Sequence, residues 1–240
     1  MLLVANVGNS QVRLGAFAEG DEPVWAQAVG VGSLDALRVP DAVVEALAVG
    51  SVNPEAAARL RRWAEAALRC PVLELGAELG VPLLFRGDAP RGIGADRLAN
   101  ALALHGRTGR GGVAVDFGTA LNLVVVSPAG EFLGGAIAPG LAMSARALHG
   151  GTALLPLVDP TDETPGISCR TRTAIATGLL WGLAGLADRL VERLAEGWPD
   201  APVLATGGDA AAIVPHCRRI HAIIPHLTLE GIRRAYLLRP

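Results

Sequence analysis

The sequence predicts an α/β protein built from two similar lobes whose facing turns form a cleft. The first observation is a repeated unit of strand, turn and strand, present once around residues 6–9 and again around residues 116–119. The second is that each copy is followed by further strands and helices. The third is composition, because 51% of the 240 residues are hydrophobic and 18% are charged. That balance favours a substantial buried core over disorder.

In the first half, apolar runs bounded by turn residues predict the strands, and longer amphipathic segments predict the helices. Residues 2–5 form a short apolar run that ends at the turn 7–10, after which Val12, Leu14 and Ala16 alternate with other residues. Residues 43–52 form another apolar run, and a helix is expected over 54–68. A second helix is expected over 96–105.

The second half repeats the opening hairpin over residues 113–126 and continues with a strand over 132–137. A long helix is predicted over 172–196, closed by Gly197 and Pro199. A strand at 203–205 runs into Thr206-Gly207-Gly208, and a helix over 229–238 follows. No low-complexity linker separates the two halves, and we place the boundary near residues 107–112. Residues 1–108 then form a lobe with the first turn, and residues 109–240 form a lobe with the second turn and a dimer surface.

Charge and cysteine usage narrow the function class. The 21 basic and 23 acidic residues give a net charge of −2, so neither nucleic acid nor an acidic membrane surface is expected as a partner. Three widely spaced cysteines favour a reducing cytoplasm over a disulfide framework. The first residues lack the basic region of a signal peptide. The apolar stretch 174–187 is shorter than the ~20 residues that span a bilayer, so we expect a buried helix of a soluble protein.

The two repeated turns have the residues of a phosphate site. Gly8 lets backbone N–H groups approach an anion without a Cβ in the way, and Ser10 adds a hydroxyl. One such turn alone is more often an ordinary hairpin. In the second copy Asp116 can bind a cation, and Gly118 with Thr119 can hold phosphate. The glycines of the 206–208 turn offer a flat surface for adenine, whereas neither a P-loop nor a Rossmann spacing occurs.

Asp96 lies at the predicted start of a helix, beside Arg97. An aspartate there is often a helix cap, and that interpretation stays open. The alternative is a general base that accepts a hydroxyl proton during phosphoryl transfer. Arg97 would then orient the acid or bind a substrate carboxylate.

Two further patterns have plainer interpretations. The histidines and the cysteine between residues 216 and 226 fit no zinc spacing, and neighbouring arginines oppose a cation, so we expect ordinary surface and core residues. Gly178, Gly182 and Gly185 recur along the long helix. They predict close helix packing, of which a dimer contact is one form.

The order of six motifs along the chain resembles that of type III pantothenate kinases. The motifs are VGNS, GADR, DFGTA, GGAIAPG, ATGG and TLEG. The resemblance covers nearly the whole chain, and the combination of residues 94–97, 116–120 and 134–140 is more specific than any single motif. It implies a duplicated ribonuclease H-like (actin-like, ASKHA) fold and a homodimer. It also implies ATP-dependent phosphorylation of the 4′-hydroxyl of pantothenate, which begins coenzyme A biosynthesis, with Mg²⁺ and a monovalent cation, K⁺ or NH₄⁺.

The resemblance also implies residue roles by position. Asp96 becomes the proton acceptor and Asp116 the ligand of the potassium ion. The residues implied to bind ATP are Asn6, Val7, Gly8, Asn9, Ser10, Gln11, Val12, Arg13 and Thr119. The residues implied to contact pantothenate are Gly94, Ala95, Asp96, Arg97 and Thr171.

Three positions depart from the family pattern. Asn6 stands where the family usually has aspartate, which removes a negative charge and weakens Mg²⁺ recruitment. Gly87 replaces a common pocket aromatic, for which Phe85 is a partial substitute, and Leu121-Asn122 replaces a Thr-Thr pair. A non-catalytic actin-fold regulator is therefore the alternative hypothesis. A sugar or acetate kinase of the same superfamily lacks support from the motifs.

Overall fold

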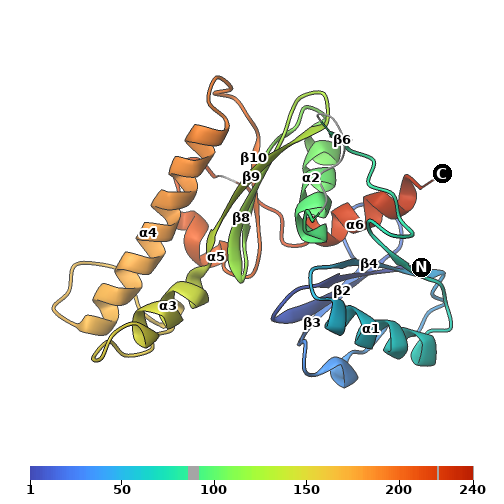
Figure 1. Ribbon diagram of the computed structural model, residues 1–240, viewed down its shortest axis with the longest axis horizontal. Coiled ribbons are helices and arrows are strands. Elements are labelled where there is room, and N and C mark those ends of the chain that lie inside the picture. The colour runs from blue at the N-terminus through green and yellow to red at the C-terminus, as the bar shows by residue number, and fades with distance from the viewer. Residues whose placement is uncertain (86–91, 221, 240) are drawn as a thin grey trace. The chain divides into compact units, whose positions relative to one another are not determined.

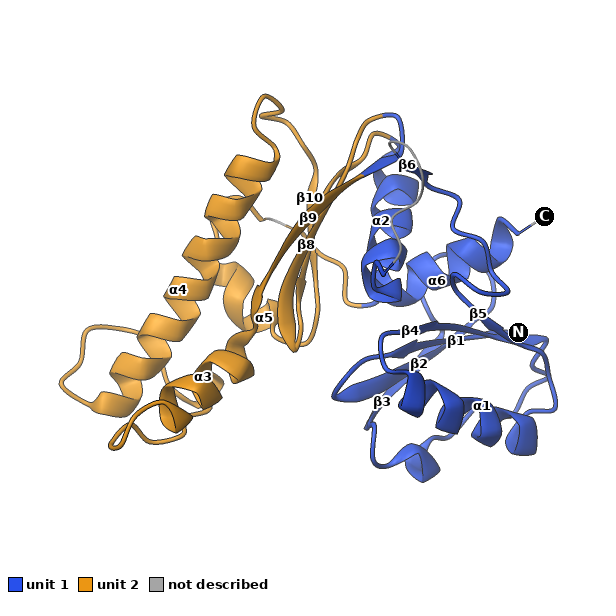
Figure 2. Cartoon of the chain, viewed as in Figure 1, with its two compact units in different colours: residues 1–109, 129–132, 226–240 blue, residues 110–128, 133–225 orange. Residues whose placement is uncertain are grey.

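The computed structural model describes residues 1–85, 92–220 and 222–239. Its contacts divide the chain into two compact units, coloured separately in Figure 2. Unit 1 comprises Met1–Gly109, Ala129–Phe132 and His226–Pro240, and unit 2 comprises Arg110–Pro128 and Leu133–Pro225. The units therefore differ from the predicted lobes 1–108 and 109–240, because the C-terminal segment returns to unit 1. We describe each unit by itself.

Unit 1 is built on a five-stranded sheet with the order β3-β2-β1-β4-β5. Strands β3, β2 and β1 are antiparallel neighbours, whereas β1, β4 and β5 run parallel. The bounds are Leu2–Val7 for β1, Gln11–Phe17 for β2, Trp25–Gly30 for β3, Ala46–Ser51 for β4 and Val72–Glu74 for β5. A 3-10 turn, η1 (Leu34–Ala36), follows β3.

Alternation along the strands of unit 1 separates two hydrophobic clusters. Leu3, Ala5 and Val7 of β1 pack with helix α1 (Pro54–Ala67). Leu2 and Val4 pack instead with α2 (Ala95–Thr108) and α6 (Leu227–Leu237). Since successive side chains of a strand point to opposite faces, this sheet is covered by helices on both faces (Figure 1). Asn53 caps α1 by accepting a hydrogen bond from the Ala56 amide at 3.1 Å.

Helix α6 closes unit 1 through a close and polar contact with α2. A Cβ on Gly231 would collide with the carbonyl oxygen of Ala99, so the helix backbones approach more closely than any other residue allows. The buried Thr228 hydroxyl donates to Asn100 Oδ1 at 2.8 Å. Glu230 is 1% exposed and pairs with Arg107 of α2 and Arg234 of α6. The last helix is thereby fixed against the element that carries Asp96.

The second sheet has the strand order β11-β10-β7-β8-β9-β6. It belongs to unit 2, except that β6 and the two residues of β9 with which it pairs, Glu131 and Phe132, fall in unit 1. The core of unit 2 packs the sheet against α3, α4 and α5. The strands are β6 (Leu84–Phe85), β7 (Gly112–Phe117), β8 (Ala120–Val126), β9 (Glu131–Pro139), β10 (Val203–Thr206) and β11 (Ala222–Ile223). The helices are α3 (Leu141–Gly150), α4 (Thr171–Leu194) and α5 (Ala210–Ile213), with 3-10 turns η2 (Pro160–Asp162) and η3 (Val214–His216).

The predicted strand–turn–strand repeat is confirmed. Strands β1 and β7 each have six residues, each pairs with an antiparallel partner, and both show the same burial pattern with a half-buried fifth residue. That fifth residue is Asn6 in unit 1 and Asp116 in unit 2. The repeat therefore places two different polar side chains at equivalent positions of two equivalent hairpins.

Helix α4 confirms the long predicted helix, but the expectation of close packing at its glycines is wrong within this chain. Nothing lies within 4 Å of a Cβ built on Gly178, Gly182 or Gly185. Of the described residues, only those of α4 form a helix long and apolar enough to cross a membrane, by length and composition alone. Its buried residues recur at helical spacing and pack in the core of unit 2, as in a core helix of a globular protein.

Candidate active site

The first hairpin of unit 1 presents a polar turn and a buried amide. Gly8 donates its backbone N–H to Gln11 O at 2.9 Å, which closes the turn, and Asn9 and Ser10 are exposed. Asn6 lies opposite Arg13 in the β1–β2 register. Asn6 Oδ1 is buried and has no hydrogen-bond partner in the part of the chain that the structure describes. The turn therefore offers a cationic side chain and an unsatisfied acceptor on one face of the hairpin.

The predicted ATP-binding segment 6–13 divides into site and core residues. Val7 and Val12 are fully buried and pack in the cluster that includes α1. Only their backbone groups can reach a ligand. Asn9, Ser10 and Gln11 are exposed, and Arg13 is half-buried.

The start of α2 lies at the same edge of the unit 1 sheet as this turn. Val52 follows β4 and donates its N–H to Val7 O at 3.0 Å. A Cβ on Gly94 would lie 3.2 Å from Val52 Cγ1. Two predicted site segments, residues 6–13 and residues 94–97, therefore both contact Val52.

Asp96 occupies the first turn of α2, whose N-cap is Gly94 and not the aspartate. The alternative prediction, that Asp96 is the N-cap residue of this helix, is therefore wrong. The Arg97 N–H donates to Asp96 Oδ1 at 2.8 Å. Burial raises the pKa of Asp96 above its ordinary value, and the hydrogen bond from Arg97 N and the charge of Arg97 offset part of that rise. The result is a half-buried carboxylate held in one orientation, as a proton acceptor requires.

Gly94 leaves the room that this carboxylate occupies. A Cβ on Gly94 would lie 2.5 Å from Asp96 Oδ1. Ala95 is nearly buried and packs in the core beneath the site. Of the segment 94–97, therefore, Asp96 and Arg97 are the side chains available to a substrate.

The second hairpin, in unit 2, places two oxygen-bearing side chains opposite each other. Asp116 pairs with Asn122 in the β7–β8 register, so the two side chains share one face of the sheet. Asn122 Oδ1 is buried and unpartnered among the described residues. The sequence interpretation had treated Asn122 only as a lost hydroxyl, whereas its carbonyl oxygen is positioned beside the predicted cation ligand.

Two glycines enclose the turn of this second hairpin. A Cβ on Gly140 would lie 2.6 Å from Thr119 O, and one on Gly207 would lie 2.6 Å from Asp116 Oδ1. Gly207 also has a φ of +98°, which disfavours other residues. Gly140, just before α3, therefore lies against the carbonyl oxygen of Thr119, and Gly207, after β10, lies against the side chain of Asp116. Gly140 belonged to a motif, but its contact with the turn was not predicted.

The remaining predicted site residues fall elsewhere. Thr171 is exposed and begins α4 in unit 2. Gly87 lies outside the described residues. Among the described residues no group of three histidine, cysteine or acidic side chains could hold a metal ion.

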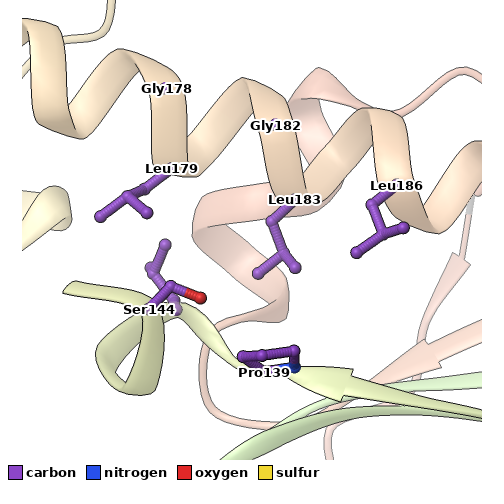
Figure 3. Close-up of a pocket in the computed structure, with 8 residues that line it drawn as sticks. Pro139, Ser144, Gly178, Leu179, Gly182, Leu183 and Leu186 are labelled. Atoms are coloured by element: carbon purple, nitrogen blue, oxygen red, sulfur yellow. The ribbon is translucent and has the colours of Figure 1, made fainter. Parts of the chain in front are cut away.

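Unit 2 also has a groove of about 190 Å³ (Figure 3), two of whose lining residues, Pro139 and Leu141, flank Gly140. Pro139 and Ser144 form one wall, and α4 forms the other through Leu179, Leu183 and Leu186. It contains none of the residues predicted to carry chemistry. The groove opens on the face of α4 where the exposed glycines lie.

Comparison with known proteins gives one consistent result. The family model for type III pantothenate kinase matches residues 2–193. A type III pantothenate kinase of Symbiobacterium thermophilum is 38% identical over 99% of this chain and 97% of its own length. A Baf family transcriptional activator from Campylobacter jejuni has a similar structure, with a TM-score of 0.65, 18% identity and coverage of 98% and 97%. A ROK family glucokinase from Streptomyces griseus, in complex with glucose and AMPPNP, is also similar in structure, with a TM-score of 0.57, 14% identity and coverage of 98% of each chain. These structures show the actin-like fold.

Proposed function

This chain belongs to the type III pantothenate kinase family, and we propose that Asp96 is the base with which it forms 4′-phosphopantothenate. The enzyme phosphorylates pantothenate with ATP, the reaction that begins coenzyme A biosynthesis. The observation that supports the assignment is the shared sheet edge, where Val52 lies between the first turn and the start of α2. A phosphate-binding turn and a proton acceptor are both needed there for transfer to a hydroxyl.

Asp96 accepts the proton of the 4′-hydroxyl. Its Oδ1 is held by the Arg97 N–H, and we assign Oδ2 to the substrate. The raised pKa of Asp96 brings this base closer to the operating pH, which favours proton transfer. Phosphoryl transfer otherwise depends on positioning and on neutralising charge. In unit 2 we assign Thr119, at the turn of the second hairpin, to the ATP phosphates, while the Gly118 N–H closes that turn by donating to Ala120 O at 3.2 Å.

The oxygen donors fit a monovalent cation in unit 2. Asp116 offers a carboxylate and Asn122 an unsatisfied amide oxygen on the same face of the hairpin. Hard cations take oxygen ligands, so we assign K⁺ or NH₄⁺ to this pair. The cation would supply positive charge beside the phosphates.

The first hairpin fits phosphate better than it fits a metal ion. Asn6 gives one neutral oxygen, and Arg13 opposite it is a cation. Mg²⁺ commonly keeps several waters and binds substrate phosphates. We therefore assign Mg²⁺ to the ATP phosphates and their waters, while Arg13 contributes positive charge directly to the anion.

We also propose a cytoplasmic homodimer. The three cysteines, Cys70, Cys169 and Cys217, are free, which agrees with a reducing compartment. The exposed glycines of α4 flank Trp181, whose side chain is 47% exposed. Close approach of a second copy would use both the small residues and the apolar ring.

The experiment that tests the function is mass-spectrometric detection of 4′-phosphopantothenate from pantothenate and Mg-ATP, with K⁺ or Na⁺ as the only monovalent cation. We expect product with K⁺ and little with Na⁺. In Asp116→Asn the K⁺ preference should be lost, because the carboxylate ligand is gone. Folded protein that makes no product at high ATP would instead favour the regulator hypothesis. An unchanged K⁺ preference in Asp116→Asn would remove Asp116 from the cation site.

Gly94→Ala should lower kcat by about 10- to 100-fold, because misplacing a catalytic group by about 1 Å has effects of this size. The new Cβ would displace Asp96 Oδ1, whose side chain can move away. The free energy of unfolding should fall by about 1 kcal/mol or less. Steady-state kinetics with a urea titration measure both quantities. Gly32→Ala, where nothing lies within 4 Å, is the control. Wild-type kcat in Gly94→Ala would show that the carboxylate position is not critical.

A further inference from the structure

Helix α6 reaches the sheet of unit 1 through a notch that a glycine leaves. Gly50 is buried near the end of β4, and a Cβ built on it would lie 2.8 Å from Ile232 Cδ1 and 3.0 Å from Ile232 Cγ1. Unbonded carbon atoms pack at about 3.5–4.0 Å. Ile232 is fully buried. Its side chain therefore takes the place that a side chain of residue 50 would need, and we call this place the Gly50 notch.

The Gly50 notch lies beneath the start of α2. The Cβ built on Gly50 would also lie 3.8 Å from Ala95 Cβ, and Ala95 packs with Ile232 in one hydrophobic cluster. Ala95 is the first residue of α2 and is 7% exposed. The next residue is Asp96, whose Oδ1 accepts the Arg97 N–H. The helical turn that carries the carboxylate is thus supported from below by the packing around Ile232.

Other contacts hold α6 in one position along α2. The two helices lie side by side over the sheet (Figure 1). Gly231 lies against the Ala99 carbonyl oxygen, and Glu230 pairs with Arg107. Gly231 and Ile232 are consecutive, so the closest approach of the two backbones is adjacent to the side chain in the notch. Since close-packed interiors transmit strain, a change at Ile232 should move the first turn of α2.

We propose that Ile232 is a positioning residue for the reaction: packed in the Gly50 notch, it sets where the first turn of α2 holds the Asp96 carboxylate. Ile232 acts on the carboxylate through Ala95 and the backbone of α2. A general base must lie within hydrogen-bond reach of the proton that it accepts, so its position matters to the rate. The inference rests on the proposed role of Asp96 as the proton acceptor.

Moving one methyl group across the notch tests the contact. Ile232→Val removes Cδ1 and should lower kcat by about 3- to 10-fold with KM for ATP unchanged, a part of the effect of a displacement of about 1 Å. Gly50→Ala inserts a methyl group where Cδ1 lies and should lower kcat to a similar extent. In the double variant the new methyl group replaces the lost one. Because residues in contact are coupled, its kcat should recover toward the wild-type value.

Leu229 offers a matched control on the same helix. A Cβ built on Gly15 of β2 would lie 2.9 Å from Leu229 Cδ1, and Leu229 is 2% exposed. The other neighbours of that Cβ are Phe17 and Pro23, and neither belongs to α2. Leu229→Val should lower the midpoint of urea unfolding at least as much as Ile232→Val does, because it disturbs an equally buried contact. Its kcat should stay at the wild-type value.

An NMR titration of the Asp96 carboxyl carbon gives a readout that needs no turnover. Burial raises the pKa of Asp96, so a displaced first turn that admits water should lower this pKa toward the ordinary value. The signal should therefore titrate at lower pH in Ile232→Val than in the wild type or in Leu229→Val.

Two results would overturn the proposal. One is an Ile232→Val protein with wild-type kcat and an unchanged Asp96 titration. The other is an equal loss of kcat in Leu229→Val, which would mean that general destabilisation explains the effect. Wild-type protein that forms no product, while Ile232→Val still shifts the Asp96 titration, would contradict the kinase activity and support the positioning of Asp96 by Ile232.

Discussion

Asp96→Asn is expected to lower kcat for pantothenate phosphorylation by about 10²- to 10⁴-fold, the range that a positioned general base contributes. The amide keeps an acceptor for the Arg97 N–H, which now donates to Asp96 Oδ1 at 2.8 Å, so the start of α2 should remain intact. It cannot accept the hydroxyl proton. Mass spectrometry of the product with Mg-ATP and K⁺ measures the loss, and KM for ATP should change little.

Asp35→Asn is the control for this variant. Asp35 lies in η1 of the same unit and is exposed. Its substitution removes the same charge from the surface and should leave kcat unchanged. If Asp96→Asn kept kcat within tenfold of the wild type, proton acceptance by Asp96 would be excluded and positioning alone would explain the catalysis.

The same variant should be more stable than the wild type near neutral pH. Burial raises the pKa of Asp96 above the ordinary value of 3.8, so the folded protein binds this proton more tightly than the unfolded chain does. Stability therefore falls as pH rises through the window between the ordinary and the raised pKa. Above that window the charged carboxylate destabilises the fold, whereas asparagine carries no charge.

Thermal unfolding at several pH values checks this sign. The midpoint of Asp96→Asn should exceed that of the wild type at pH 7, and the difference should narrow on acidification toward pH 4. A difference that is absent at pH 7, or that grows on acidification, would show that the pKa of Asp96 is not raised. Loss of activity together with a gain of stability would indicate a residue retained for chemistry.

Gly231→Ala is expected to destabilise the protein by about 3 kcal/mol, at the upper end of the usual cost of overpacking. The added Cβ would strike the backbone of Ala99, which cannot move aside as a flexible side chain can. Helices α2 and α6 must then separate, and the contacts of Thr228 and Glu230 with α2 must stretch. Because Ala99 lies one turn beyond Asp96, kcat should fall as well. Urea unfolding and steady-state kinetics measure the two effects.

Gly150→Ala is the matched control, because it adds the same methyl group at the end of a helix where nothing lies within 4 Å. Its free energy of unfolding should stay the same or rise by about 0.5–1 kcal/mol, since alanine favours helix over glycine. Wild-type stability in Gly231→Ala would mean that the two helices are not in contact as described.

Local patterns predicted most elements and the hairpin repeat. The turn residues around Gly8 and Gly118 and the apolar runs beside them act over a few positions, so they can be read along the chain. The same holds for α1, α2 and α4, whose amphipathic spacing sets their burial. Strand β3 (Trp25–Gly30) and helix α3 (Leu141–Gly150) were not predicted. Glycine and small residues in both segments weaken the periodic signal.

Long-range contacts account for most of what sequence reasoning missed. Ile232 is an ordinary apolar helix residue in sequence and reaches Gly50 only through the packing of α6 on the sheet. Asn122 becomes a candidate cation ligand only because the β7–β8 register places it opposite Asp116. The exposed glycines of α4 show the reverse case, where a pattern suggested packing that the single chain does not make. The roles of Asp96, Asp116 and Thr119, and the cleft between lobes, stay predictions.

The discontinuity of unit 1 has a consequence for protein synthesis. Residues 1–109 leave the ribosome first, but their hydrophobic cluster beneath α2 lacks Leu229, Ile232 and Tyr236 until the segment His226–Pro240 has been made. Unit 2 is contiguous apart from residues 129–132 and does not need the segment 226–240 to complete its core. Nascent domains commonly mature from the N-terminus onward, whereas here the N-terminal unit must wait. Until the segment 226–240 packs, the apolar side chains of this cluster, including Ala99 and Leu102 of α2, lack their partners from α6.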